Sequence, residues 1–259
     1  MDKKGLLLCA QYAASPNFFG FCGPSKSSSL IDHLVEKQAD GEVSYILSEF
    51  ETLYPYLRLI ARENSIADFF DRKVVEAYWI GNNLLCSVRQ QNDSFFDQCL
   101  GLERKIERKN FAAFMRKIRL FNYLPHHAFH VMNIFKRTGR NPSVHTIETM
   151  DACKIGWGRV IAINADSWAI VATKPLIMKK NKLALGTAMQ KNIQFSYGKK
   201  QYMKKLLHGS WVSFHWEHVC DILTEKQVKN LAYYTQKAID FFNNPTKRYE
   251  HLRFWQFFG

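Results

Sequence analysis

The stretch CKIGWGRVIAINADSWAIVA, residues 153–172, contains two short apolar runs separated by an Asn-Ala-Asp segment. Residues 159–163 and 168–172 are rich in Val, Ile and Ala, and the polar residues between them are typical of a turn. The two runs therefore predict β-strands. Further runs at 193–197 and 211–216 predict two more strands. Several short strands so close in sequence indicate a small, OB-like β-barrel.

The chain before this stretch follows helical periodicity. A Ser-rich segment at Ser27 is a typical helix start, and apolar residues recur at helical spacing through 42–64, 71–88 and 111–121. Pro55 falls inside the first of these patterns and is expected to kink or divide it.

This change of pattern predicts an α+β protein with two domains. Residues 1–148 form an all-α domain, and residues 149–259 form the OB-like barrel with a C-terminal helix. The best linker candidate is 139–143, and the Thr-x-x-Gln capping box at 224–227 marks the start of the final helix. The apolar end, 254–258, is a docking segment, a partner contact or a flexible tail.

Composition excludes several classes of protein. The 259 residues are 47% hydrophobic and 14% aromatic, enough for a substantial core, and no apolar run near the start is long enough for a signal peptide or a membrane span. The six cysteines include no CxxC pair. P-loop, GxGxxG and GxSxG motifs are absent from the sequence. We expect a soluble, cytoplasmic protein without a disulfide framework.

The positive charge is concentrated in the second half. Residues 1–150 hold 19 Lys and Arg against 16 Asp and Glu, whereas residues 151–259 hold 17 against 7, and the whole chain has a net charge of +13. This asymmetry predicts an acidic partner, either a protein surface or nucleic acid, although a solvated basic face is the simpler interpretation.

Two motifs in the second half belong together. Cys153 lies five residues before Gly158 in the first predicted strand, and His215 lies six residues after Gly209 in a later one. These spacings resemble those of the small HypC-type chaperones of [NiFe]-hydrogenase maturation. The resemblance covers residues 151–243, with an insertion-like region in the middle.

The resemblance implies a metal-centre assembly factor, an iron-carrying chaperone. In that family a barrel carries an iron that bears cyanide and carbon monoxide, and the partners are a maturation scaffold and the hydrogenase large-subunit precursor. Carried over, the metal ligands are Cys153 and His215, although Cys153 is internal whereas the family's cysteine is N-terminal. If the strand continues past His215, Glu217 shares its face and orients it, and Asp151 is a second candidate for this supporting role.

The whole chain also resembles an uncharacterised bacterial family, a domain of unknown function in which a helical domain precedes such a barrel. Residues 21–24, 76–82 and 125–130 carry this resemblance. It implies a two-domain architecture and no particular activity.

The predicted helical domain holds a second candidate site. His126, His127 and His130 lie within five positions, and on a helix the first and last share a face. Cys22 precedes a Ser-rich helix start that could acidify its thiol. These residues suggest a metal-dependent enzyme as one alternative, although ordinary packing explains them equally well. Glu76, in an apolar helical pattern, is either a buried base or an ion-pair partner.

A nucleic-acid-binding protein is the remaining alternative. A basic barrel with exposed aromatic residues can stack bases and follow phosphates. The lysines that would serve this purpose are Lys199, Lys200, Lys204 and Lys205. The histidine and cysteine of the barrel favour the metal interpretation, so we rank nucleic acid lower. The sequence does not decide whether the protein is an enzyme, and the metal interpretation favours a non-enzymatic maturation chaperone.

Overall fold

The computed structural model describes most of the chain. The described residues are 1–25, 27–87, 108–120, 124–134, 139–141, 144–164, 167–203 and 206–244. The apolar end at 254–258, Cys99, and the lysines Lys204 and Lys205 lie outside these ranges.

Helices dominate the first part of the described chain. They are α1 Lys3–Phe18, α2 Ser27–Glu36, α3 Gly41–Ser48, α4 Tyr54–Glu63, α5 Arg72–Trp79, the 3-10 helix η1 Asn83–Ser87, α6 Arg108–Leu120, the short α7 His127–Phe129 and the π-helix η3 His130–Ile134. α2 begins at Ser27 as predicted, and Pro55 lies in the first turn of α4 and so divides the predicted 42–64 helix.

Strands follow one further helix, α8 Ile147–Cys153. They are β1 Gly156–Ile163, β2 Trp168–Thr173, β3 Leu176–Lys179, β4 Lys182–Leu185, β5 Met189–Gln194, β6 Ser196–Tyr197, β7 Lys200–Gln201, β8 Trp211–His215 and β9 His218–Leu223. The chain then forms α9, Glu225–Asn243, whose capping box joins Thr224 and Gln227 as the sequence predicts. The α+β class is confirmed.

The main sheet closes on itself in the order β1-β2-β5-β9-β8. Its neighbours are antiparallel except β5 and β9, and β1 also pairs with β8. Val160, Val171, Val212 and Phe214 are among the buried residues that fill its interior. Along β8 the side chains alternate, so Ser213 faces the helices and bonds to Tyr12.

The strand at His215 does not continue, which corrects one expectation. β8 ends at His215, which pairs directly with His218 at the start of β9. The two residues between them, Trp216 and Glu217, have φ of 47° and 64°, as a type I′ turn requires. The sequence Trp-Glu does not favour this turn, because positive φ normally selects Gly, Asn or Asp. Glu217 is therefore a turn residue and does not share a strand face with His215.

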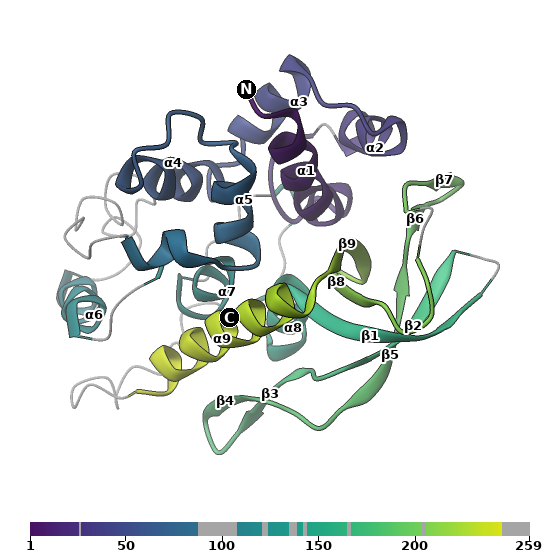
Figure 1. The fold of residues 1–259 in the computed structure, drawn as a ribbon. Helices are drawn as coiled ribbons and strands as arrows, with labels where there is room; N and C mark the ends of the chain where they lie inside the picture. The colour runs from purple at the N-terminus through teal and green to yellow at the C-terminus, as the bar shows by residue number, and fades with distance from the viewer. Residues whose placement is uncertain are drawn as a thin grey trace.

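The helical part and the sheet pack directly on one another (Figure 1). α1 contacts β8 and β9, while α9 lies against α7, η3 and β4. One hydrophobic cluster includes residues from α1, α5 and α9. The predicted boundary at 148/149 falls inside α8, and the division into two domains stays a prediction. The described part of the predicted linker, 139–141, is docked, because the Asn141 N–H donates to the Gly20 carbonyl at 2.9 Å.

The turn after α5 anchors the final helix. Tyr234 of α9 donates its hydroxyl to the Asn82 carbonyl at 2.8 Å, and Asn230 donates to the Gly81 carbonyl at 2.9 Å. Gly81 has φ of 96°, and a Cβ there would lie 1.9 Å from the Tyr234 ring. Both the backbone conformation and the close approach of the ring therefore require glycine at this position.

We expect Gly81→Ala to lower the free energy of unfolding by about 2–4 kcal/mol, because it combines backbone strain with overpacking. Gly209→Ala is the matched control, since Gly209 has φ of 81° but a Cβ added there would meet no atom within 4 Å. Backbone strain alone predicts that the control lowers the free energy of unfolding by about 1 kcal/mol. Urea unfolding of both variants measures the difference, and equal losses would show that the Tyr234 contact is unimportant.

Candidate metal centre

Three predicted candidates from different elements meet at one place. One ring nitrogen of His127, one of His215 and the Sγ of Cys153 all lie within 4.8 Å of one another. In the described ranges this is the one group of three or more His, Cys, Asp or Glu residues close enough to hold a metal ion. Cys153 and His215 are the ligand pair inferred from the sequence, and His127 comes from the separate histidine cluster.

Local structure brings these side chains together. His127 opens α7, whose N-terminus is capped by His126, and Cys153 is the last residue of α8, which begins with a Thr146–Thr149 capping box. His215 is the last residue of β8. The Trp216 N–H donates to the Ala152 carbonyl at 2.9 Å, so the turn after His215 is bonded to the end of α8. This backbone hydrogen bond places Cys153 beside His215.

Backbone carbonyls orient both imidazoles. His127 Nε2 lies 2.9 Å from the Cys153 carbonyl oxygen, and His215 Nδ1 lies 2.8 Å from that of Tyr12. A carbonyl oxygen only accepts, so each of these nitrogens carries the proton. In the neutral ring the opposite nitrogen is then an acceptor, which for His127 is Nδ1, 3.2 Å from the Tyr78 hydroxyl. Both nitrogens of His127 thus have hydrogen-bond partners, so His127 can ligate a metal only by exchanging one of these bonds for the metal. An N–H donated to a carbonyl is the usual support of a metal-binding histidine.

The imidazoles lie in a dry, aromatic environment. His127 and His215 are 6% and 1% exposed, whereas Cys153 is half-buried. The Trp79 ring lies 4.5 Å from that of His127 and 5.8 Å from that of His215. Burial, reinforced by the neighbouring His215, holds the pKa of His127 well below its usual value. His127 is therefore neutral at physiological pH, the form that binds metals.

The donor set fits a transition metal. Thiolate sulfur is a soft ligand and imidazole nitrogen a borderline one, and both suit iron, zinc, copper or nickel better than magnesium or calcium. Three protein ligands also leave at least one coordination position for another group, unlike a closed structural zinc site with four. The chemistry of these residues thus supports binding of a metal together with an exogenous ligand.

The other members of the histidine cluster have structural contacts. His126 Nδ1 accepts from the Ala128 N–H at 3.1 Å, and burial lowers the pKa of His126 to about 3. His130 lies 3.1 Å from the Tyr56 hydroxyl. Cys22 Sγ lies 3.5 Å from Thr52 Oγ1. Among the described residues, neither His126, His130 nor Cys22 belongs to the three-residue group around Cys153.

The expected supporting carboxylates lie elsewhere. Asp151 pairs with Lys154 at 3.0 Å, and Glu217 pairs with Lys191 at 3.5 Å. The Tyr12 carbonyl, not Glu217, bonds to His215. Sequence spacing could not reveal this support, because a backbone carbonyl of a distant helix leaves no residue-specific signal. Nor could it assign His127 to this group, since tertiary packing alone brings it to Cys153.

Glu76, the remaining sequence candidate, accepts a hydrogen bond from Gln227 Nε2 at 2.9 Å.

Asp221 on β9, whose carboxyl feels the charge of Glu76, has a raised pKa. Burial raises the pKa of Asp221 to about 6, and the Glu76 charge adds to this effect, while the Ile222 N–H and Arg72 oppose it. No pattern in the sequence singles out Asp221.

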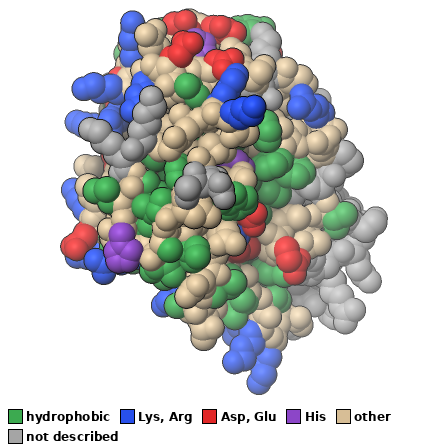
Figure 2. Space-filling view, turned by 90° about the vertical axis from the view of Figure 1, so that its right-hand side faces the viewer, with side chains coloured by type: hydrophobic (Ala, Val, Ile, Leu, Met, Phe, Trp, Pro, Cys, Tyr) green, Lys and Arg blue, Asp and Glu red, His purple; other side chains and the backbone are tan. Residues whose placement is uncertain are grey.

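The basic residues do not form one patch on the face that Figure 2 shows. Lys and Arg side chains lie mainly around its edge, and hydrophobic side chains gather nearer its centre (Figure 2). Of the four lysines named for nucleic acid, Lys199 and Lys200 are described, and Lys200 pairs with Asp32 of α2. This view gives the nucleic-acid alternative no added support.

Comparison with known proteins identifies a family. A family model described as a family of unknown function, DUF6390, matches residues 1–249. No curated protein and no solved structure matches the chain. The match confirms the resemblance to an uncharacterised family and is silent on the HypC-type resemblance. Among the described helices, none combines the length and apolar character that crossing a membrane requires.

Asp221 gives a pH-dependent prediction. Its carboxyl keeps a proton up to about pH 6 in the folded protein but releases it near the ordinary aspartate pKa of 3.8 when unfolded. Stability contributed by this group is therefore lost as the pH rises from about 4 to 6. We expect Asp221→Asn to raise the free energy of unfolding by about 1–3 kcal/mol at neutral pH, with little gain near pH 4.

Thermal unfolding across this pH range measures the effect. Asp240→Asn is the control, because Asp240 is exposed on α9 and bonds to Gln236. A constant difference between Asp221→Asn and wild type at every pH would contradict the raised pKa.

Proposed function

The chain belongs to the DUF6390 family, and we propose that it is a metal-centre assembly factor that carries iron on Cys153, His215 and His127. The observation that carries this proposal is the approach of a thiol and two imidazoles, supplied by three separate elements, to within 4.8 Å.

The ligand number suits a carrier. Low-spin iron accepts thiolate and imidazole ligands, and the positions left open can hold small ligands such as cyanide and carbon monoxide, which would travel with the iron as cargo. The same feature allows release, because a client protein can add ligands before the carrier's own are lost. The half-buried Cys153 is the most accessible member of the group, so we infer that the client approaches from its side.

The HypC-type resemblance supplies the specific context. In those chaperones the residues corresponding to Cys153 and His215 are implicated in handling iron, and the closed five-stranded sheet here is compatible with an OB-like barrel. The net charge of +10 on residues 151–259 fits an acidic protein partner, for which a hydrogenase large-subunit precursor or a maturation scaffold is our candidate.

A metal-dependent enzyme is the second candidate, and one observation favours it. His127, from the helical part, adds a third ligand to the two in the resemblance, and three protein ligands with an open position are also the arrangement of catalytic zinc sites. An enzyme would retain its metal, whereas a carrier would give it up to a client.

Anaerobic purification with metal analysis and infrared spectroscopy tests the proposal. We expect stoichiometric iron with cyanide and carbonyl stretching bands in protein from cells that make an active hydrogenase. Cys153→Ala and His215→Ala should each lose the bands, and His127→Ala should weaken metal binding at least about 100-fold, more than the loss of a supporting residue.

Matched controls separate ligand loss from general damage. Cys86→Ser and His208→Gln change an exposed cysteine and an exposed histidine outside the site, and both should keep the metal. Zinc in place of iron, retained in the presence of a client, would favour the enzyme. Metal that survives substitution of both Cys153 and His215 would contradict either function at this site.

A further inference from the structure

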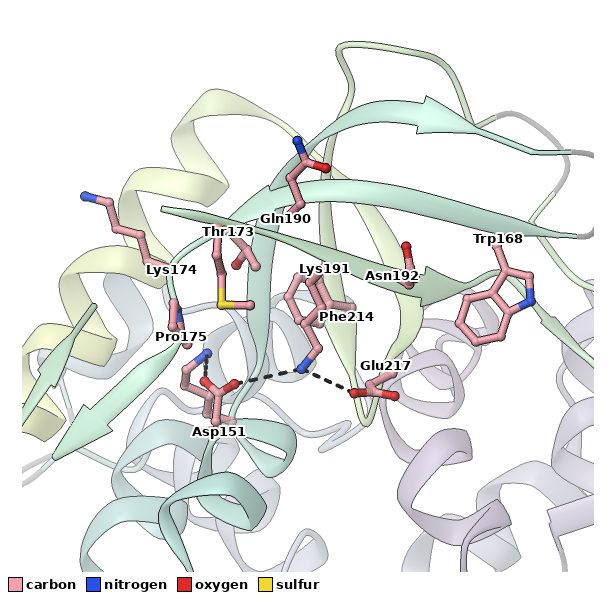
Figure 3. A pocket seen from close by; sticks show the side chains of 12 residues that line it. Asp151, Trp168, Thr173, Lys174, Pro175, Gln190, Lys191, Asn192, Phe214 and Glu217 are labelled. Carbon is pink, nitrogen blue, oxygen red and sulfur yellow. Dashed lines mark ion pairs between the residues drawn. The ribbon is translucent and has the colours of Figure 1, made fainter. Parts of the chain in front are cut away.

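A polar pocket lies beside the candidate metal centre, and none of the three candidate ligands lines it. It has a volume of about 540 Å³ and is formed by the end of α8, the ends of β2 and β5, and the turn between β8 and β9 (Figure 3). Asp151, Lys154, Lys191 and Glu217 supply most of its charge. Small-molecule sites in proteins commonly have about this volume, about 300–1,000 Å³.

The pocket contains a buried lysine that is paired with a carboxylate. The side chain of Lys154 is only 2% exposed, and its Nζ lies 3.0 Å from Asp151 Oδ1. Asp151 also accepts the Leu176 N–H at 2.6 Å. This pair forms a fixed floor, because separating it would leave a buried charge unpaired.

Lys191 is held differently. Its Nζ lies 3.8 Å from Asp151 Oδ2 and 3.5 Å from Glu217 Oε1, both longer than the roughly 2.8 Å of a close charge-assisted hydrogen bond. In Figure 3 the Lys191 ammonium points between these two carboxylates. The Glu217 side chain is 58% exposed, so it can turn into solvent at little cost. Lys191 is thus a partly buried cation whose more exposed partner, Glu217, is replaceable.

We propose that this pocket binds a small organic anion, with a carboxylate or phosphate group at Lys191 in the position that Glu217 now occupies. The lining as a whole holds three lysines and two carboxylates, and in Figure 3 the Lys174 side chain points away from Lys191, which leaves Lys191 as the cation that would meet the anion. The aromatic rings of Trp168 and Phe214 provide an apolar wall for the body of the ligand.

This site is distinct from the proposed metal function. Lys154 follows Cys153 in sequence and Phe214 precedes His215, yet their side chains line the pocket while those of Cys153 and His215 meet His127. Anion binding can therefore be tested in the metal-free protein, and failure of either proposal leaves the other standing.

The test is calorimetric titration of the full-length, metal-free protein at low ionic strength with two probes, inorganic phosphate and succinate. We expect saturable binding of at least one probe with a Kd below about 1 mM. Lys191→Gln should weaken it at least about tenfold, because it removes a charge-assisted hydrogen bond. Glu217→Gln should strengthen it, because it removes the carboxylate that competes for Lys191. The probe that binds with the lower Kd shows whether the site prefers a phosphate or a carboxylate group.

Lys182→Gln is the matched control, since Lys182 is an exposed lysine of β4 outside the pocket. This variant should bind both probes with the same Kd as wild type. The proposal is overturned if neither probe saturates, if Lys191→Gln binds as wild type does, or if Glu217→Gln weakens binding. The last result would mean that Glu217 positions Lys191 and does not compete with the ligand for it.

Discussion

Tyr12 joins the helical part of the molecule to its sheet, and the candidate metal centre depends on this contact. Its hydroxyl lies 2.8 Å from Ser213 Oγ, its carbonyl oxygen lies 2.8 Å from His215 Nδ1, and its ring stacks on Trp79 at 5.4 Å. Tyr12 is completely buried, so each of these polar contacts forms away from water, where an unpaired group would be costly. One residue of α1 thereby sets both the position of β8 and the orientation of its last histidine.

The three candidate ligands are consequences of this docking. His215 follows from the contact of β8 with α1, and Cys153 follows from the hydrogen bond between Trp216 and Ala152. His127 is held from its other side by Tyr78 of α5. Each imidazole is a buried polar ring whose desolvation is offset in part by a hydrogen bond to a backbone carbonyl. A bound metal would offset the remainder, which is why we propose a metal-binding role for the cluster.

The sequence predicts local features well and tertiary ones poorly. Three features act through neighbouring residues, so each is visible in the sequence and agrees with the structure: Pro55, the capping box at Thr224 and the apolar run of β2. The turn at 216–217 was missed because its positive φ angles fall on Trp and Glu. Those angles are maintained by long-range contacts, among them the stacking of Trp216 on Phe21 at 4.2 Å, which no local propensity reports.

The same distinction between local sequence signals and tertiary contacts explains how much of the candidate metal centre could be predicted. Spacing paired Cys153 with His215 only through a resemblance, and it assigned His127 to a separate cluster, because ligands from three elements have no fixed separation in sequence. Strand geometry separates the candidate metal centre from the pocket, since successive residues of a strand point to opposite faces. Phe214 lines the pocket and His215 faces the helices, and at the end of α8 the change from helical to extended backbone at Lys154 turns its side chain away from that of Cys153. Two neighbouring residues at each of two junctions thus border the candidate metal centre and the proposed anion pocket, and we expect a change at either junction to affect both.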